Sequence, residues 1–249
     1  LGTQDRDTLE IGGTGYINKY LNVGRLDLAF GEVTIGPRLN FPELAPGVTA
    51  GSVKPYLIFN EVGLGLDQYF FTYGGGVEAT AIFDGGLRLR AAFEFRQKSF
   101  SDAPDRPLSR GLNGNDKLVA IELDKSITDN SVLTLQFDFL DQRTRFDFYS
   151  NKAYAGTVAY RIRYDDPTGW LHLPWQTGLF LSRTWQNYAA PDPCCNTSGS
   201  PFFFFPSDRF DRRWRFGISQ SIEVAADTSI ILQVPVSYTH LRAHETGRN

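Results

Sequence analysis

Apolar and polar residues alternate along most of this chain. In the stretch GLRLRAAFEFRQK, residues 86–98, leucine and phenylalanine occupy one parity, and arginine, glutamate and lysine occupy the other. Successive side chains of a β-strand point to opposite faces, so this period of two predicts a strand with one apolar and one charged face. Which of the two faces points inward decides the class of protein.

The same alternation recurs from end to end and predicts an all-β, antiparallel up-and-down sheet of about eleven strands. The expected strands are residues 8–23, 24–36, 53–64, 69–83, 86–98, 117–125, 132–139, 157–164, 174–186, 214–223 and 229–238. In the second of these stretches the apolar parity changes near Gly31, which predicts a β-bulge there.

The connections between the expected strands alternate in length from the fourth strand onward. Residues 84–86, 126–130, 165–169 and 225–228 are short, whereas residues 100–115, 143–153 and 187–209 are long. Short turns at one end and long loops at the other are typical of outer-membrane barrels. Nearer the N-terminus the alternation fails, because residues 40–52 look long and residues 64–68 look short. Either a strand is misassigned there or that end has an irregular turn.

Two architectures produce strands of this kind. In a soluble sandwich or lipocalin-like barrel the apolar parity forms the core, whereas in an outer-membrane barrel it meets lipid and the polar parity lines the lumen. Several of the expected strands reach the roughly 9–11 residues that a tilted strand needs to cross a bilayer. Aromatic residues near the strand ends and the density of charge on the other parity also favour the membrane barrel.

This interpretation assigns side chains to the two faces of the barrel wall. The predicted lipid-facing residues are Leu87, Leu89, Phe93, Phe95, Leu135, Phe137, Tyr160, Ile162, Trp214 and Phe216. The predicted lumen-lining residues are Arg88, Arg90, Glu94, Arg96, Asp138, Arg161, Arg163, Arg215 and Glu223.

Composition supports a strand-rich chain and argues against a nucleic-acid partner. The sequence holds 20 Phe, 11 Tyr, 4 Trp and 24 Gly, and these residues favour strands and turns. Its 25 basic and 28 acidic residues give a net charge of −3, which does not suggest a nucleic-acid polyanion as partner. No apolar run is long enough for a transmembrane helix, but closed barrels cross bilayers without one.

The amphipathic stretches GLRLRAAFEFRQK and AYAGTVAYRIRYDD and the short turn Asp84-Gly85-Gly86 resemble Gram-negative outer-membrane β-barrels. More narrowly, the pattern is similar to the barrel domain of the surface lipoprotein assembly modifier family, which follows a periplasmic tetratricopeptide-repeat region. That resemblance implies a bacterial outer-membrane location, the lipid bilayer as partner and a periplasmic repeat domain within the same precursor.

The two ends of the sequence lead to separate expectations. Residues 1–7 precede the first strand, and the absence of Met, even at position 1, is expected of an internal piece of a longer precursor. Residues 8–236 form the expected partial barrel. Residues 237–249, SYTHLRAHETGRN, lose the alternation and resemble translated sequencing adaptor, so we expect a non-native tail there. The alternative is a metal site on His240 and His244, which lacks further ligands.

No constellation of residues predicts catalysis, so we expect neither an enzyme nor a cofactor. His172 lies between Trp170 and Trp175 beside a turn, which suits an interfacial position. The adjacent Cys194 and Cys195 are candidates for a loop disulfide and offer too few ligands for a metal. The run Phe202 to Phe205 in the same long connection would dip into the interface or form a partner surface.

These observations together predict an incomplete outer-membrane β-barrel that takes part in transport or export across the outer membrane, with a cargo that the sequence does not identify. Two alternatives stay open. One is a structural or adhesive barrel whose loops bind partners, and the other is a soluble β-sandwich binding module.

Overall fold

The described part of the chain forms eleven β-strands, and the prediction of an all-β chain is confirmed. The computed structural model describes residues 6–19, 27–65, 67–104, 106–167, 169, 173–190, 210–225 and 228–242. The strands are β1 (Thr8–Asn18), β2 (Leu28–Ala45), β3 (Val48–Leu64), β4 (Asp67–Phe83), β5 (Leu87–Phe100), β6 (Gly114–Thr128), β7 (Ser131–Thr144), β8 (Asn151–Tyr164), β9 (Trp175–Tyr188), β10 (Phe210–Ala225) and β11 (Thr228–Arg242). Among the described connections are the short 3-10 helices η2 (Ser109–Leu112) and η3 (Asp147–Tyr149).

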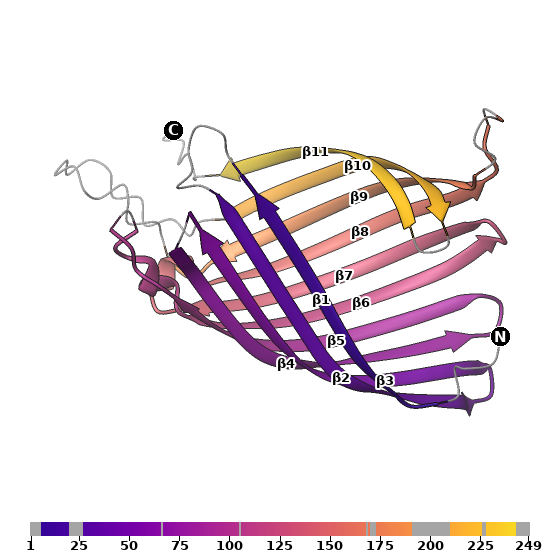
Figure 1. Ribbon diagram of the computed structural model, residues 1–249, viewed down its shortest axis with the longest axis horizontal. Coiled ribbons are helices and arrows are strands. Elements are labelled where there is room, and N and C mark those ends of the chain that lie inside the picture. The colour runs from indigo at the N-terminus through magenta and orange to yellow at the C-terminus, as the bar shows by residue number, and fades with distance from the viewer. Residues whose placement is uncertain are drawn as a thin grey trace, which may run out of the picture.

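Each strand pairs antiparallel with the next one along the chain, so the sheet has the predicted up-and-down order from β1 to β11. Figure 1 shows the sheet curling, with β1 and β2 crossing in front of the strands from β5 onward. No ladder joins β1 to β11 in the described part of the chain. The sheet is therefore open, with these two strands as its edges, as expected of an incomplete barrel.

The connections fall into two groups at opposite ends of the sheet (Figure 1). The hairpins β2–β3, β4–β5, β6–β7, β8–β9 and β10–β11 lie at one end, which we call the turn end. The remaining connections lie at the other, the loop end, and include the long segments between β5 and β6 and between β9 and β10. The predicted alternation of short and long connections holds from β4 to β7 and again from β9 to β11. It fails between them, because the turn-end β8–β9 connection, residues 165–174, is longer than the loop-end β7–β8 connection, residues 145–150.

The expectation of a long connection over residues 40–52 is wrong. β2 runs to Ala45 and β3 begins at Val48, so only Pro46 and Gly47 form the turn. Gly47 has a φ of 84°, which a residue without a Cβ adopts at no steric cost. The β3–β4 connection is equally short, so one loop-end connection is tight. β2 and β3, with 18 and 17 residues, are instead longer than β5 with 14.

The predicted bulge near Gly31 is also absent. Gly31 pairs with Gly15 on one side and with Glu61 on the other, without a shift of register. The apolar parity changes because Phe30 belongs to an apolar cluster on the otherwise polar face. Phe30 is in register with Val62, which is in register with Phe70, and the Phe70 and Phe100 ring centroids lie 4.8 Å apart.

Backbone strand structure also continues past the predicted end at Val236. Residues 237–242 pair with β10, with Ser237 opposite Arg215 and Arg242 opposite Phe210. The non-native origin proposed for residues 237–249 stays a prediction, and residues 243–249 lie outside the described residues.

The burial of the two faces is the reverse of that in a soluble sheet. We call them the apolar face, which carries Leu87 and Leu89, and the polar face, which carries Arg88 and Arg90. The apolar face holds exposed side chains such as Leu135 (44% exposed), Phe137 (46%) and Phe216 (52%). In the described residues only Ile58 and Val62 are buried hydrophobic side chains, and both belong to the polar face. Polar side chains including Asn60, Thr72, Asp116 and Asp124 are buried there as well. The chain thus covers its polar side and leaves its apolar side uncovered.

Glycine at position 74 allows a close approach between β4 and β5. A Cβ on Gly74 would lie 2.1 Å from the carbonyl oxygen of Phe95, so any side chain there forces the two backbones apart. Gly156, in β8, has no atom within 4 Å of the same position. Two glycines in the same sheet thus differ completely in the space around them.

We predict that Gly74→Ala lowers the free energy of unfolding by about 1–3 kcal/mol because of this overlap. Gly156→Ala, the matched control, should change it by less than about 0.5 kcal/mol. Urea unfolding of both variants in lipid vesicles measures the difference. Equal losses for the two variants would contradict the steric account of Gly74.

Candidate functional site

The polar face collects the residues that the sequence assigned to a lumen. Cross-strand register places eight of the nine predicted side chains on this one face, on β5, β7, β8 and β10. These are Arg88, Arg90, Glu94, Arg96, Asp138, Arg161, Arg163 and Arg215. The ninth, Glu223, lies in β10, and its side chain is outside the described part of the structure. That this face lines a lumen stays a prediction.

A chain of ion pairs crosses the polar face from β1 to β6. We call it the ionic belt, and its members are Glu10, Arg38, Lys54, Glu78, Arg88, Arg90, Glu122 and Asp124. At its β1 edge, Glu10 accepts hydrogen bonds from Arg38 Nε at 2.5 Å and from Lys54 Nζ at 2.6 Å. Arg38 also donates to Ser52 Oγ at 3.0 Å. One carboxylate thereby ties together three strands.

The belt continues through alternating charges on the next strands. Glu78 lies 3.6 Å from Arg38 Nη2 and 3.9 Å from Arg90 Nη1. Arg90 Nη2 donates to Glu122 Oε2 at 2.9 Å. Arg88 then pairs with Asp124, which also accepts a hydrogen bond from Thr134 Oγ1 of β7 at 2.5 Å. An isolated exposed pair contributes little, so we attribute stability to the network rather than to any single pair.

A second network spans strands that are not neighbours in the sheet. Tyr56 of β3 donates its hydroxyl hydrogen to Glu94 Oε1 of β5 at 2.6 Å, passing over β4. Arg96 Nε donates to Glu94 Oε2 at 2.7 Å, and Arg96 Nη1 lies 3.5 Å from Glu32 of β2. The Tyr56 side chain can pass over β4 because β4 carries glycine at the crossing point. A Cβ on Gly76 would lie 2.8 Å from the Tyr56 ring.

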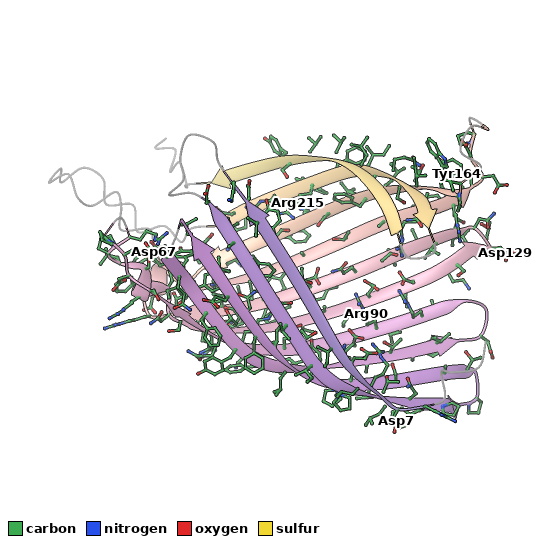
Figure 2. All side chains as sticks on the ribbon, in the orientation of Figure 1. Asp7, Asp67, Arg90, Asp129, Tyr164 and Arg215 are labelled. Atoms are coloured by element: carbon green, nitrogen blue, oxygen red, sulfur yellow. The ribbon has the colours of Figure 1, made fainter. Side chains whose placement is uncertain are left out.

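These contacts show that the polar face is the inside of the curve. Side chains from β3 and β5 meet across one intervening strand, and side chains from β2 and β5 meet across two, because the sheet bends toward them. Figure 2 shows Arg90 and Arg215 among the side chains that lie within the curl of the sheet. The charged parity therefore points inward, and the apolar parity points outward.

The charges are unevenly distributed around this inner surface. Acidic side chains accompany the cations on β1 to β7, as the ionic belt shows. On β8 to β10 the polar face carries Arg161, Arg163, Arg213 and Arg215. Asp211 is the acid among the described side chains of the same face there. Arg213 and Arg215 are exposed and make no ion pair in the described structure. This part of the surface is basic.

The outward face carries all ten of the predicted lipid-facing residues, which share one parity in the cross-strand register. Its aromatic residues occur toward both strand ends and also in mid-strand, where Phe93, Phe137 and Phe216 lie. Phe139, Tyr154 and Trp185 are in register near the loop end, with the Phe139 and Tyr154 centroids 5.0 Å apart. At the turn end, Tyr164 is in register with Trp175. Aliphatic residues such as Val158 and Leu181 lie between them.

Several residues singled out in the sequence lie outside the described part of the structure. These are Cys194, Cys195, His172, His244 and the run Phe202 to Phe205, together with the side chain of His240. Among the described residues no group of His, Cys, Asp and Glu could hold a metal ion. The predictions of a loop disulfide and of a non-enzymatic chain stay predictions.

Sequence reasoning missed most of the ionic belt, including Glu10, Arg38, Lys54, Glu78 and Asp124. Glu10 and Asp124 alternate with apolar residues along their strands, and this polar parity is the signal that the sequence offers. The ion-pair partners of these residues follow only from the register between strands. The parity within one strand does not specify which residues of the next strand lie opposite.

Comparisons with known proteins assign no function to this chain. No protein-family model matches the chain, and no curated protein matches it. Among solved structures, a crystal structure of Pseudomonas aeruginosa OccK10 (OpdN) is similar over 95% of this chain and 93% of that chain, with 13% sequence identity and a TM-score of 0.21. At that score the two chains superpose poorly, so the likeness supports no statement on function. No helix in the described ranges has the length and hydropathy needed to span a membrane.

We predict that Tyr56→Phe destabilises the folded protein by about 1.5–3 kcal/mol, because it removes a hydrogen bond to a carboxylate and keeps the ring. Tyr160→Phe, on the apolar face, is the matched control and should be near neutral. Urea unfolding in vesicles measures both. Equal stability of Tyr56→Phe and the wild type would contradict a structural role for the Tyr56–Glu94 contact.

Proposed function

We propose that this chain forms part of the wall of an outer-membrane β-barrel that carries material across the outer membrane. One observation carries the proposal, namely that the apolar face is exposed and the charged face is turned inward. A sheet in water would lose stability by exposing this much apolar side-chain surface, whereas in a bilayer the same surface contacts hydrocarbon.

The ends of the strands support a transmembrane arrangement. Outer-membrane barrels have aromatic girdles at both interfaces, short periplasmic turns and longer extracellular loops. The aromatic residues at both strand ends and the grouping of the connections agree with this plan. The turn end would then face the periplasm and the loop end would face outward. A periplasmic repeat domain in the same precursor is part of the proposal that the sequence resemblance supplies.

The inner surface supports passage of polar material. Acids and bases on β1 to β6 pair with each other in the ionic belt, whereas Arg213 and Arg215 of β10 are exposed and make no ion pair in the described structure. Charged side chains that line a pore set its ion selectivity. We therefore expect a conducting barrel to prefer anions along this part of its wall.

The full-length protein in planar bilayers tests this proposal. It should conduct, and the combined substitution Arg213→Gln and Arg215→Gln should lower its anion-to-cation permeability ratio at least about twofold, as measured from the reversal potential in a salt gradient. Lys125→Gln, which removes a cation from the apolar face, should leave the ratio unchanged.

Three results would contradict the proposal in different ways. Insertion without conductance would favour a structural or adhesive barrel. Conductance with unchanged selectivity in the arginine variant would contradict the assignment of Arg213 and Arg215 to the lumen. A monomer that stays in the aqueous fraction would favour the soluble sandwich.

A further inference from the structure

Cations gather on the apolar face near the loop end. They are Lys117 on β6, Lys152 on β8, Arg183 on β9 and Arg212 on β10, and we call this set the outer basic rim. Register places each of them on the outward parity. Lys117 lies opposite Phe95, Arg183 opposite Trp214, and Arg212 opposite Trp185. These are positions that an apolar side chain would suit better than a charge.

The rim has a large excess of positive charge. On the outward face of β6 to β10 near the loop end, the acid among the described side chains is Asp141. It lies in register between Lys117 and Lys152 and pairs with a fifth cation, Arg143, at 3.4 Å. At the turn end of the same face the described strands carry one cation, Lys125, whose Nζ donates to the carbonyl oxygen of Gly85 at 2.6 Å. The positive charge is therefore confined to one rim of the outward face.

Arg183 occupies the most elaborate position in the rim. Its guanidinium carbon lies 4.6 Å from the Trp185 ring centroid and 4.6 Å from the Trp214 ring centroid. Cation–π contacts with two indoles can hold a guanidinium on an apolar surface. Its Nε is buried and has no hydrogen-bond partner in the described structure. Because this Nε is buried, an anion outside the barrel would meet the guanidinium at its terminal nitrogens.

The surface beside Arg183 is open. Gly156 lies directly opposite Arg183 across the β8–β9 ladder, and a Cβ there would meet no atom within 4 Å. Tyr154 and Trp185 border this gap one step nearer the loop end. The gap lets a group outside the barrel approach the guanidinium.

We propose that the outer basic rim binds the phosphate headgroup of an anionic membrane lipid. The inference rests on the proposed function, because it requires the apolar face to contact the bilayer. At the depth of the outer basic rim, a bound partner must offer both hydrocarbon and a charged headgroup. A lipid offers both. Basic side chains at a membrane surface attract anionic headgroups, and aromatic residues beside them lie at the same level. With the loop end outward, the lipid would belong to the outer leaflet.

Lipid retention by the full-length protein tests the inference. The protein is reconstituted in phosphatidylcholine nanodiscs that contain phosphatidic acid as a minor component. Lipid that stays bound after detergent extraction is then counted by native mass spectrometry. We expect the wild type to retain phosphatidic acid in preference, and Arg183→Gln combined with Arg212→Gln to reduce that retention about tenfold. Lys125→Gln, on the same face at the turn end, should retain as much as the wild type.

Two further variants guard against misfolding of the double variant. Lys152→Gln changes an exposed side chain and should lower retention while folding normally. Arg183→Lys keeps the charge, loses the planar guanidinium, and should give an intermediate value.

Equal retention by the wild type and the double variant would overturn the inference, and so would an equal loss in Lys125→Gln. Displacement of the lipid by inorganic phosphate at a similar concentration would show a free-phosphate site instead. A protein that conducts but shows no headgroup preference contradicts only this inference, whereas a protein that never enters bilayers contradicts the proposed function as well.

Discussion

The structure depends on one constraint, which is that every strand presents its apolar parity to the same side of the sheet. A slip of one residue in any ladder would transfer the side chains of that strand to the opposite face. The register between β5 and β6 runs without interruption from Leu87 to Lys98. Where shifts occur, as at Ser126/Thr128 or Glu223/Ala225, they lie beside the turns, where few residues follow them. The two faces therefore stay separate across the sheet.

That separation determines how charge is accommodated. Charged side chains on the inside of a curve are brought close together, so they must pair or remain exposed to water in the interior. On β1 to β6 they pair, and glycines in β4 provide the space for Tyr56 and Arg96 to reach across strands. On β10, Arg213 and Arg215 stay exposed instead. The inner surface of the curved sheet thus has a neutral part, where charges pair on β1 to β6, and a basic part on β10.

The sequence predicted the strands and their two faces well, because both follow from a local period of two. It failed where the cause was not local. Residues 40–52 were expected to form a long connection, yet Pro42 lies within β2 and Pro46 lies in a two-residue turn. Phe30 looked like a parity slip because its apolar partners, Val62 and Phe70, come from other strands. The Tyr56–Glu94 contact depends on curvature, which no single strand encodes.

The orientation of the two faces toward lipid and water is the central claim, and a nitroxide scan along β7 tests it most directly. Single labels from residue 133 to 139 in the full-length protein, with Cys194 and Cys195 replaced by serine, would be compared for collision with oxygen and with a water-soluble nickel reagent. If the apolar face meets lipid, accessibility varies with a period of two, with labels at Leu135 and Phe137 accessible to oxygen and labels at Gln136 and Asp138 accessible to nickel. The opposite phase, or nickel access at every position, would contradict it.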